Sequence, residues 1–429
     1  RAEYLSLTDS KYSRNKTEEK RNSMNINIDI DYFIRTFITG RKESLLKPDI
    51  GKYQAELEKR INGKKVLVIG GAGTIGSSYI KAVLKYDVSS LVVVDINENG
   101  LTELVRDLRS SNGCNIPADF VTYPMNFGDR VFEKMFRSLA PFDIVANFAA
   151  HKHVRSEKDV FSVEAMIENN VLKAKGLLEL LLQYPPEHFF CVSTDKAANP
   201  VNIMGASKKL MEELIMAYSD RLPITTARFA NVAFSNGSLP LGFIERLNKR
   251  QPWSCPKGMR RFFVSPQESG ELCMIASVLG APGDIIFPKL DPGKDMITFD
   301  TMALDLLKYL GMTADICTSE EEARRKASML SNNPESYPVY FFESDTSGEK
   351  PYEEFFTENE VIDNERFINL GIIKNTVRRD PGEVNEIIEG LGRLFASENV
   401  TKAAIVDNLK SLLPNFEHIE KGKGLDSKM

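Results

Sequence analysis

Short apolar runs alternate with longer amphipathic segments from Asn62 onward, and this alternation constrains the fold more than any other feature of the chain. Repeated strand–helix units build a parallel sheet covered by helices on both faces, with right-handed crossovers. We therefore predict an α/β fold with a doubly wound, Rossmann-type parallel sheet, a smaller C-terminal part and extra helices at both ends. The expected strands cover residues 66–69, 91–94, 120–122, 144–148, 189–192 and 224–229, and the expected helices lie near 75–86, 98–111, 129–138, 160–183 and 203–219.

A glycine-rich turn follows the first expected strand and opens the first expected helix, reading Gly-Gly-Ala-Gly-Thr-Ile-Gly over residues 70–76. Glycines in this place let the backbone approach the pyrophosphate of a dinucleotide, which lies at the positive end of the helix. A tight turn without a ligand is the alternative. We expect the cofactor to bind at Gly70, Gly73, Thr74, Ile75 and Gly76.

Asp95 ends the second expected strand, 19 residues after Gly76. A carboxylate in this place can accept hydrogen bonds from the adenosine ribose of a nicotinamide dinucleotide. Because no Arg follows it directly, the sequence favours NAD over NADP, with NADP left open. An Asp at the end of a strand is also an ordinary candidate to cap the next helix.

Residues 193–208 read STDKAANPVNIMGASK and follow an expected strand. This segment places an acid, Asp195, beside an amine, Lys196, and such a pair can protonate one oxygen and remove a nearby proton. Met204 and Lys208 follow on one face of a helix, one turn apart. The alternative is that Asp195 caps the following helix and Lys196 is solvated.

The glycine turn and residues 193–208 together resemble the extended short-chain dehydrogenase/reductase superfamily. Within it they are most similar to the UDP-N-acetylglucosamine 4,6-dehydratases of polysaccharide biosynthesis, whose pattern is close to S-T-D-K-A-x-N-P-x-N-x-M/Y-G-x-x-K. The resemblance covers roughly residues 37–360 and begins at the stretch FITGR, residues 37–41. Some of these relatives carry membrane helices, and we expect none in this chain.

The resemblance implies a hydro-lyase that uses NAD to convert UDP-N-acetylglucosamine into a UDP-2-acetamido-2,6-dideoxy-4-hexulose. In this reaction hydride leaves C4 of the sugar, a proton leaves C5, water leaves from C6, and the hydride returns to C6. Asp195 would be the acid for the departing 6-hydroxyl and would have to stay protonated. Lys196 would be the base for C5 and would have to lose its proton, while Thr194 would orient the sugar hydroxyl.

Met204 stands where short-chain dehydrogenases carry a catalytic Tyr. A thioether cannot accept a proton, so O4 of the sugar would have to pass its proton to Asp195, directly or through water. Lys208 would hydrogen-bond the nicotinamide ribose. Some membrane-linked dehydratases of the family also have Met here, so the catalytic set implied by the resemblance is Thr194, Asp195, Lys196, Met204 and Lys208.

Further segments match the family's pattern. The resemblance places Ala149 and Ala150 beside the cofactor and gives Asn170 a supporting position there. Arg261 is the candidate for the diphosphate, because a guanidinium suits bidentate phosphate recognition. Ordinary solvated surface charge is the alternative for several of these residues. The expected substrate-binding set is Lys152, His153, Asn231, Ser238, Arg261, Glu349 and Tyr352.

Two other functions compete with a dehydratase. A 4-epimerase inverts a 4-keto sugar without eliminating water, and it would not need the pair of Asp195 and Lys196. A nucleotide-binding scaffold would have lost catalysis together with the Tyr. The intact sequence of Thr194, Asp195 and Lys196 argues against the scaffold.

The composition excludes several classes of protein. The chain has 429 residues, of which 42% are apolar and 27% charged, and its net charge of −5 argues against a nucleic-acid partner. Its five Cys residues form no CxxC pair, which disfavours a disulfide framework or a metal site and favours the cytoplasm. No apolar run is long enough to insert into a membrane. The expected partner is a UDP-sugar, and we expect a homo-oligomer.

The expected organisation has four parts. An N-terminal arm with helices covers residues 1–62, of which 1–23 are left out of the fold prediction. A Rossmann domain covers 63–232 and takes a returning strand from about 284–288. The substrate-binding part covers 233–360, and a helical region covers 361–429.

Overall fold

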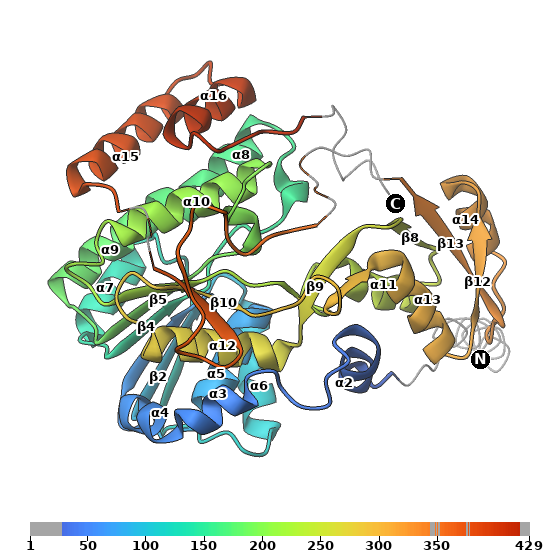
Figure 1. Ribbon diagram of the computed structural model, residues 1–429, viewed down its shortest axis with the longest axis horizontal. Coiled ribbons are helices and arrows are strands. Elements are labelled where there is room, and N and C mark those ends of the chain that lie inside the picture. The colour runs from blue at the N-terminus through green and yellow to red at the C-terminus, as the bar shows by residue number, and fades with distance from the viewer. Residues whose placement is uncertain are drawn as a thin grey trace, which may run out of the picture.

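A computed structural model of the chain describes residues 28–343, 348, 350, 352–374, 376 and 378–420. Within these residues, a nine-stranded sheet forms the centre of the molecule (Figure 1). Seven strands run parallel in the order β3-β2-β1-β4-β5-β6-β10, and β15 and β14 extend one edge in antiparallel pairing. The strands are β1 (Lys65–Ile69), β2 (Ser90–Asp95), β3 (Asp119–Pro124), β4 (Ile144–Asn147), β5 (His188–Val192), β6 (Ile224–Ala227), β10 (Ile285–Pro288), β14 (Ile362–Asp363) and β15 (Leu370–Ile373).

The strand order confirms the predicted doubly wound sheet. The path of the chain through the sheet begins at β1 and moves outward to β3. It then crosses to β4 on the other side of β1. The carboxyl ends of β1 and β4 therefore lead to opposite sides, and such a reversal opens a crevice where ligands bind. Both faces of the central strands are covered, since Val66, Leu67 and Val68 of β1 are fully buried.

Helices cover both faces of the sheet. In Figure 1, α9 (Lys173–Gln183) and α10 (Ile203–Met216) lie on one side, and α5 (Thr74–Val83) and α12 (Pro266–Leu279) pack together on the other. The expected single helix over 160–183 is interrupted, because a π-helical turn at Glu168–Leu172 separates α8 from α9. The remaining helices of the sheet domain are α3 (Lys47–Lys52), α4 (Gln54–Ile61), α6 (Glu98–Ser110), α7 (Arg130–Leu139) and α8 (Val160–Ile167).

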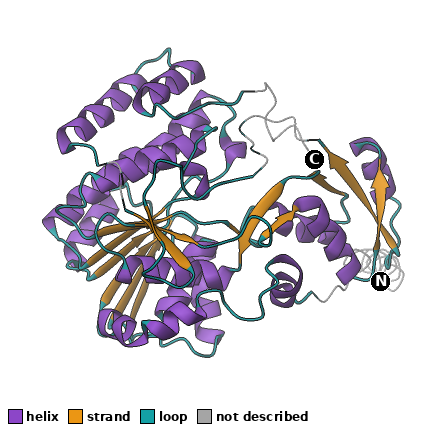
Figure 2. Cartoon of the chain, viewed as in Figure 1, coloured by secondary structure: helices purple, strands orange, loops and turns teal. Residues whose placement is uncertain are grey.

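A smaller lobe lies beside the main sheet, seen at the right of Figure 2. Its own apolar core gathers around Trp253, Phe243, Leu306 and Tyr337. Two three-stranded sheets belong to this side of the molecule, in the orders β11-β9-β7 and β12-β13-β8. Its elements are β7 (Asn231–Val232), α11 (Leu239–Asn248), β8 (Trp253–Pro256), β9 (Arg260–Val264), β11 (Met296–Thr298), α13 (Phe299–Tyr309), β12 (Thr313–Cys317), α14 (Glu320–Ala327) and β13 (Ser336–Phe342).

The sheet domain takes more of the chain than the expected division assigns to it. Helix α12 comes from the stretch expected to bind substrate, yet it packs on α5 and beneath β5 and β6. The region after residue 361 contains β14 and β15 as well as helices. These strands are two and four residues long, too short for an alternating pattern to reveal them.

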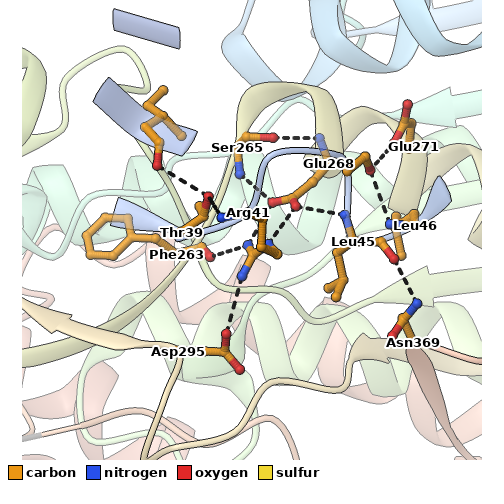
Figure 3. A network of polar contacts seen from close by, with 12 residues as sticks. Thr39, Arg41, Leu45, Leu46, Phe263, Ser265, Glu268, Glu271, Asp295 and Asn369 are labelled. Atoms are coloured by element: carbon orange, nitrogen blue, oxygen red, sulfur yellow. Dashed lines mark hydrogen bonds and ion pairs between the residues drawn. The ribbon is translucent and has the colours of Figure 1, made fainter. Parts of the chain in front are cut away.

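The N-terminal segment joins the two lobes. Its helix α2 (Ile30–Phe33) lies in the core of the smaller lobe, whereas α4 packs on α12. Between them, the Arg41 guanidinium donates to both carboxylate oxygens of Glu268, each at 2.8 Å, and contacts Asp295 at 3.3 Å (Figure 3). Glu268 also completes a capping box with Ser265 at the start of α12.

The C-terminal helices cover α10. These are α15 (Pro381–Phe395) and α16 (Lys402–Leu412), and α16 contacts α10 directly. Every residue of α10 except Lys209 is buried. Among the described residues, none of the helices has the length and apolar composition needed to cross a membrane.

Candidate functional site

A cavity of about 190 Å³ opens at the carboxyl ends of β1, β2 and β4, where the strand order reverses. Parallel strands end together at this edge, so residues far apart in sequence meet there. The cavity brings together nine of the residues predicted for the site. They are Gly70, Gly73, Thr74, Ile75, Gly76, Asp95, Ala149, Ala150 and Lys152.

The glycine turn is shaped by close backbone contacts. Gly70 has φ of +77°, and a Cβ there would lie 2.5 Å from the Ala149 nitrogen. A Cβ on Gly76 would lie 2.3 Å from the Gly70 carbonyl oxygen. Gly73 is the N-cap of α5, and no side chain among the described residues caps this helix. The first amides of α5 therefore face the cavity, which suits a pyrophosphate.

Asp95 lies on the wall of the cavity at the end of β2. Its Oδ2 accepts a hydrogen bond of 2.9 Å from the Ala72 amide, and its Oδ1 accepts one of 2.9 Å from the Asn97 amide. The cap of α6 is Asn97, which accepts from the Gly100 amide. Asp95 thus fixes the glycine turn to β2 and does not itself cap the helix.

Asn170 and Lys208 are buried and tie neighbouring elements together. Asn170 lies in the π-helical turn, accepts from the His151 amide at 2.9 Å, and donates to Ser207 Oγ at 3.0 Å. It joins the loop after β4 to α10. Lys208 Nζ donates to the Val192 carbonyl at 2.7 Å, and burial lowers its pKa.

The residues Thr194, Asp195 and Lys196 form a compact polar cluster directly after β5. Asp195 is only 3% exposed, and its Oδ1 accepts from Thr194 Oγ1 at 2.8 Å, from the Lys196 amide at 2.9 Å and from Lys196 Nζ at 3.1 Å. Its other oxygen, Oδ2, is buried and has no hydrogen-bond partner among the described residues. Leaving such an atom unsatisfied is costly, so Oδ2 is suited to meet a ligand.

A second carboxylate faces the same lysine. Glu353 Oε1 lies 3.9 Å from Lys196 Nζ, and the Glu353 side chain is buried. Burial works against the charge of Lys196, but Asp195 and Glu353 together outweigh it and hold the pKa of Lys196 above its usual value. A base for C5 would need the opposite shift. The environment in this structure therefore keeps Lys196 charged.

Met204 lies on α10, and only 2% of its surface is exposed. Its amide donates to Glu157 Oε1 at 2.8 Å, at the start of the helix. Burial raises the pKa of Glu157 to about 6. Glu157 is one of the residues that the sequence prediction missed, because it belongs to an irregular stretch and matches no motif.

A second cavity, of about 440 Å³, lies between the loop after β4 and the smaller lobe. His153 and Ser238 line it, together with Arg246 and Ser254. Ser254 Oγ and Arg246 Nε are buried without a hydrogen-bond partner among the described residues. Unsatisfied polar atoms on the wall of a cavity are suited to meet a polar ligand.

The other predicted substrate residues lie at different depths. Arg261 is buried on β9 and donates to the Arg260 carbonyl at 2.8 Å, and Asn231 Nδ2 donates to the Phe262 carbonyl at 3.4 Å. Tyr352 is 52% exposed. Glu349 lies outside the described residues.

Burial lowers the pKa of His153, with further lowering from Lys152 and Arg155, so its ring is neutral at neutral pH.

A family model described as a polysaccharide biosynthesis protein matches residues 66–375. The chain belongs to this family. The membership confirms the resemblance that the glycine turn and residues 193–208 indicated. The matched residues span both lobes, from β1 to just beyond β15.

Two relatives of the chain are named as polysaccharide biosynthesis proteins. It is 30% identical over 82% of its length to the probable polysaccharide biosynthesis protein EpsC of Bacillus subtilis, and 27% identical over 82% to the capsular polysaccharide biosynthesis protein CapD of Staphylococcus aureus. It covers 56% and 54% of those two chains, and so spans about half their length. A UDP-glucose 4-epimerase of Rickettsia bellii is 26% identical over 83% of this chain and 97% of its own.

Solved structures confirm the fold. The X-ray structure of Pen from Bacillus thuringiensis matches with a TM-score of 0.58 and 21% identity, over 75% of this chain and 89% of that one. A UDP-glucuronic acid 4-epimerase from Bacillus cereus, in complex with UDP-4-deoxy-4-fluoro-glucuronic acid and NAD, matches with a TM-score of 0.50 and 19% identity, over 68% and 89%.

Proposed function

We propose that this protein is an NAD-dependent nucleotide-sugar 4,6-dehydratase that acts on UDP-N-acetylglucosamine in the synthesis of a polysaccharide or glycan. The observation that carries the proposal is the buried cluster of Thr194, Asp195 and Lys196 after β5, with one Asp195 oxygen unsatisfied. An acid beside an amine at this edge of the sheet would supply both proton transfers that the elimination requires, once the amine has lost its own proton. Family membership supports the same class of substrate.

The residues around the smaller cavity fit a dinucleotide. The amides at the start of α5 would hold the pyrophosphate, Asp95 would receive the adenosine ribose, and Ala149 and Ala150 leave space for a flat ring. Lys208 would bind the nicotinamide ribose from α10. When bound, NAD would take up hydride from C4 of the sugar and return it to C6. NADP remains compatible with this pocket.

The chain's own residues would handle the protons. With Met204 unable to accept one, Asp195 Oδ2 would take the proton from O4 and deliver it to the departing 6-hydroxyl. Thr194 would orient the sugar hydroxyl, and Lys196 would take and return the C5 proton. The cavity lined by His153, Ser238 and Ser254 would hold the nucleotide part of the substrate, with Arg261 near its diphosphate.

A 4-epimerase is the second candidate, because relatives that align over nearly their whole length carry that name. An epimerase needs no group that releases the 6-hydroxyl, so the acid in the cluster distinguishes the two. We further propose that the enzyme acts in the cytoplasm as a homo-oligomer.

One experiment separates the candidates. The purified protein is incubated with UDP-N-acetylglucosamine without added cofactor, and the products are followed by mass spectrometry and NMR. A dehydratase gives a 4-keto-6-deoxy sugar lighter by one water, and NADH does not accumulate because the hydride returns within the cycle. An epimerase gives a product of unchanged mass, and that result would replace the proposal.

A further inference from the structure

Glu353 is a buried carboxylate in the segment between β13 and β14, with 5% of its surface exposed. A buried charge of this kind is rare unless it is paired, because taking it out of water is expensive. Its partner is Lys196, the amine of the cluster after β5. The two residues are 157 positions apart in the sequence, so the contact exists only because of the fold.

The segment that carries Glu353 is fixed from both sides. Arg228 is fully buried on the sheet, donates to the Phe355 carbonyl at 3.0 Å, and pairs with Glu360 at 2.9 Å. Asn199, in the loop that follows Lys196, donates to Glu354 at 3.0 Å. These contacts place Glu353 against the cluster and hold it there.

The phenyl ring of Phe355 adds an apolar anchor. Its ring lies 5.2 Å from that of Phe262 on β9 and 6.1 Å from that of Phe287 on β10. Such aromatic contacts stabilise a single arrangement of the segment. Phe355 thus anchors the segment two residues after Glu353.

Among the described residues, several charged groups act on Glu353. They are Lys196 and Asp195 from the turn after β5, Arg261 from β9, and Lys350 from its own segment. Burial, aided by the charge of Asp195, raises the pKa of Glu353, while the three cations oppose this shift. The carboxylate is thus more basic than an exposed one, and it faces an ammonium group.

We propose that Glu353 is the proton partner of Lys196, accepting the proton that Lys196 must lose before its amine can act as a base. The two groups lie 3.9 Å apart in this structure and must come to hydrogen-bond distance in the substrate complex. In this step the N–H bond of the Lys196 ammonium breaks and an O–H bond forms on Glu353. The charged pair becomes a neutral amine and a neutral acid. The amine then takes the C5 proton, returns it to C5 at the end of the cycle, and recovers its first proton from Glu353. This inference rests on the proposed function and deepens it.

The physical reason is the dielectric environment. A lysine between two carboxylates cannot release its proton to solvent easily, as the raised pKa of Lys196 indicates. A transfer within the pair removes two buried charges at once, and burial favours the neutral forms of both groups. Substrate that closes the site and excludes water strengthens this preference.

The test compares Glu353→Gln with Glu358→Gln, a matched change at an exposed position of the same segment. In the native enzyme the proton stays within the pair, so kcat at saturating substrate should be nearly constant from pH 6.5 to 8.5. In Glu353→Gln the proton must pass to solvent, and kcat should rise about tenfold per pH unit until Lys196 titrates. Glu358→Gln should keep the flat profile. Glu353→Gln with a flat profile, at native or at uniformly reduced kcat, overturns the proposal.

A second measurement does not depend on the reaction. The rate at which acetic anhydride modifies Lys196 is followed by mass spectrometry against pH. Removing the carboxylate should let Lys196 react at lower pH in Glu353→Gln than in the native protein or Glu358→Gln, and equal profiles overturn the proposal. If Glu353→Gln fails to fold, Glu353→Asp must keep the flat kcat profile, and a slope there overturns it. If Lys196 is labelled as expected but the native enzyme releases no water from the substrate, only the proposed dehydratase activity is refuted.

Discussion

The Lys196 ammonium group lies between the carboxylates of Asp195 and Glu353, and this decides how the site can work. The motif places the acid beside the amine, but it does not reveal the second carboxylate. Without Glu353, the amine would appear free to act as a base. With it, the cluster has two acids and one amine, and each needs a defined role.

The first prediction concerns the acid and the amine. Asp195→Asn and Lys196→Ala should each lower kcat by on the order of 10²-fold or more, because each removes a proton-transfer group. Asn keeps the shape of Asp195 and leaves an acceptor for Thr194. Binding of UDP-N-acetylglucosamine, measured by calorimetry, should change little in Asp195→Asn. A variant with native turnover would remove its residue from the mechanism.

The second prediction concerns Met204. If the O4 proton passes to Asp195, the thioether only fills space on α10, and Met204→Leu is nearly volume-conserving. The variant should keep most of its activity, since its backbone amide still donates to Glu157. The measurement is kcat, with NAD content and melting temperature as controls. A loss as large as that of Asp195→Asn, with both controls intact, would mean that sulfur takes part.

At the scale of elements, local patterns predicted the parts that have a regular period. The strands of the parallel sheet and the glycine turn follow from alternation and spacing in the sequence. The π-helical turn at Glu168–Leu172 was not predicted, because it is a single turn inside one continuous helical stretch and has no sequence signal of its own. The contacts of Arg41 could not be predicted from local patterns either, because its partners lie more than 200 residues away. These partners are Phe263, Glu268 and Asp295.

The third prediction tests the glycine turn. In Gly76→Ala the new Cβ would meet the Gly70 oxygen at 2.3 Å and the Gly71 Cα at 2.8 Å, so backbone must move. We expect lower NAD content and a loss of stability of about 1–3 kcal/mol, measured by thermal unfolding. The matched control is Gly176→Ala in α9, where nothing lies within 4 Å. The free energy of unfolding of this control variant should rise by about 0.5–1 kcal/mol. Full NAD content in Gly76→Ala would contradict this account.

At the scale of the whole molecule, the segment that follows α16 returns to the site. After α16, the Glu417 amide donates to the Pro200 carbonyl at 3.2 Å and the Ile419 amide to the Val201 carbonyl at 3.0 Å. The Gly348 amide in turn donates to the Ile419 carbonyl at 2.9 Å. The sequence predicted terminal helices, but this contact depends on how they pack over α10, which no local pattern contains.

Glu157 lies where this returning segment meets α10. It accepts from the Met204 amide, and His418 of the returning segment approaches it at 4.0 Å. Burial raises its pKa to about 6 from an ordinary 4.5, with Glu420 adding to the shift and Lys402 opposing it. Between these two pH values the folded protein holds a proton that the unfolded chain has released. The free energy of unfolding therefore falls as pH rises through this window.

The last prediction follows from that sign. Glu157→Gln cannot ionise and still offers an oxygen to the Met204 amide, so it lacks the cost of a buried charge. Its melting temperature, relative to the native protein, should rise as pH increases from 4.5 to 6 and then level off. The full difference corresponds to about 2 kcal/mol, from a shift of about 1.5 pH units. Glu398→Gln, at an exposed position, should show no such trend. A constant difference between pH 4.5 and 7 would mean that Glu157 titrates normally, and that the returning segment does not bury it.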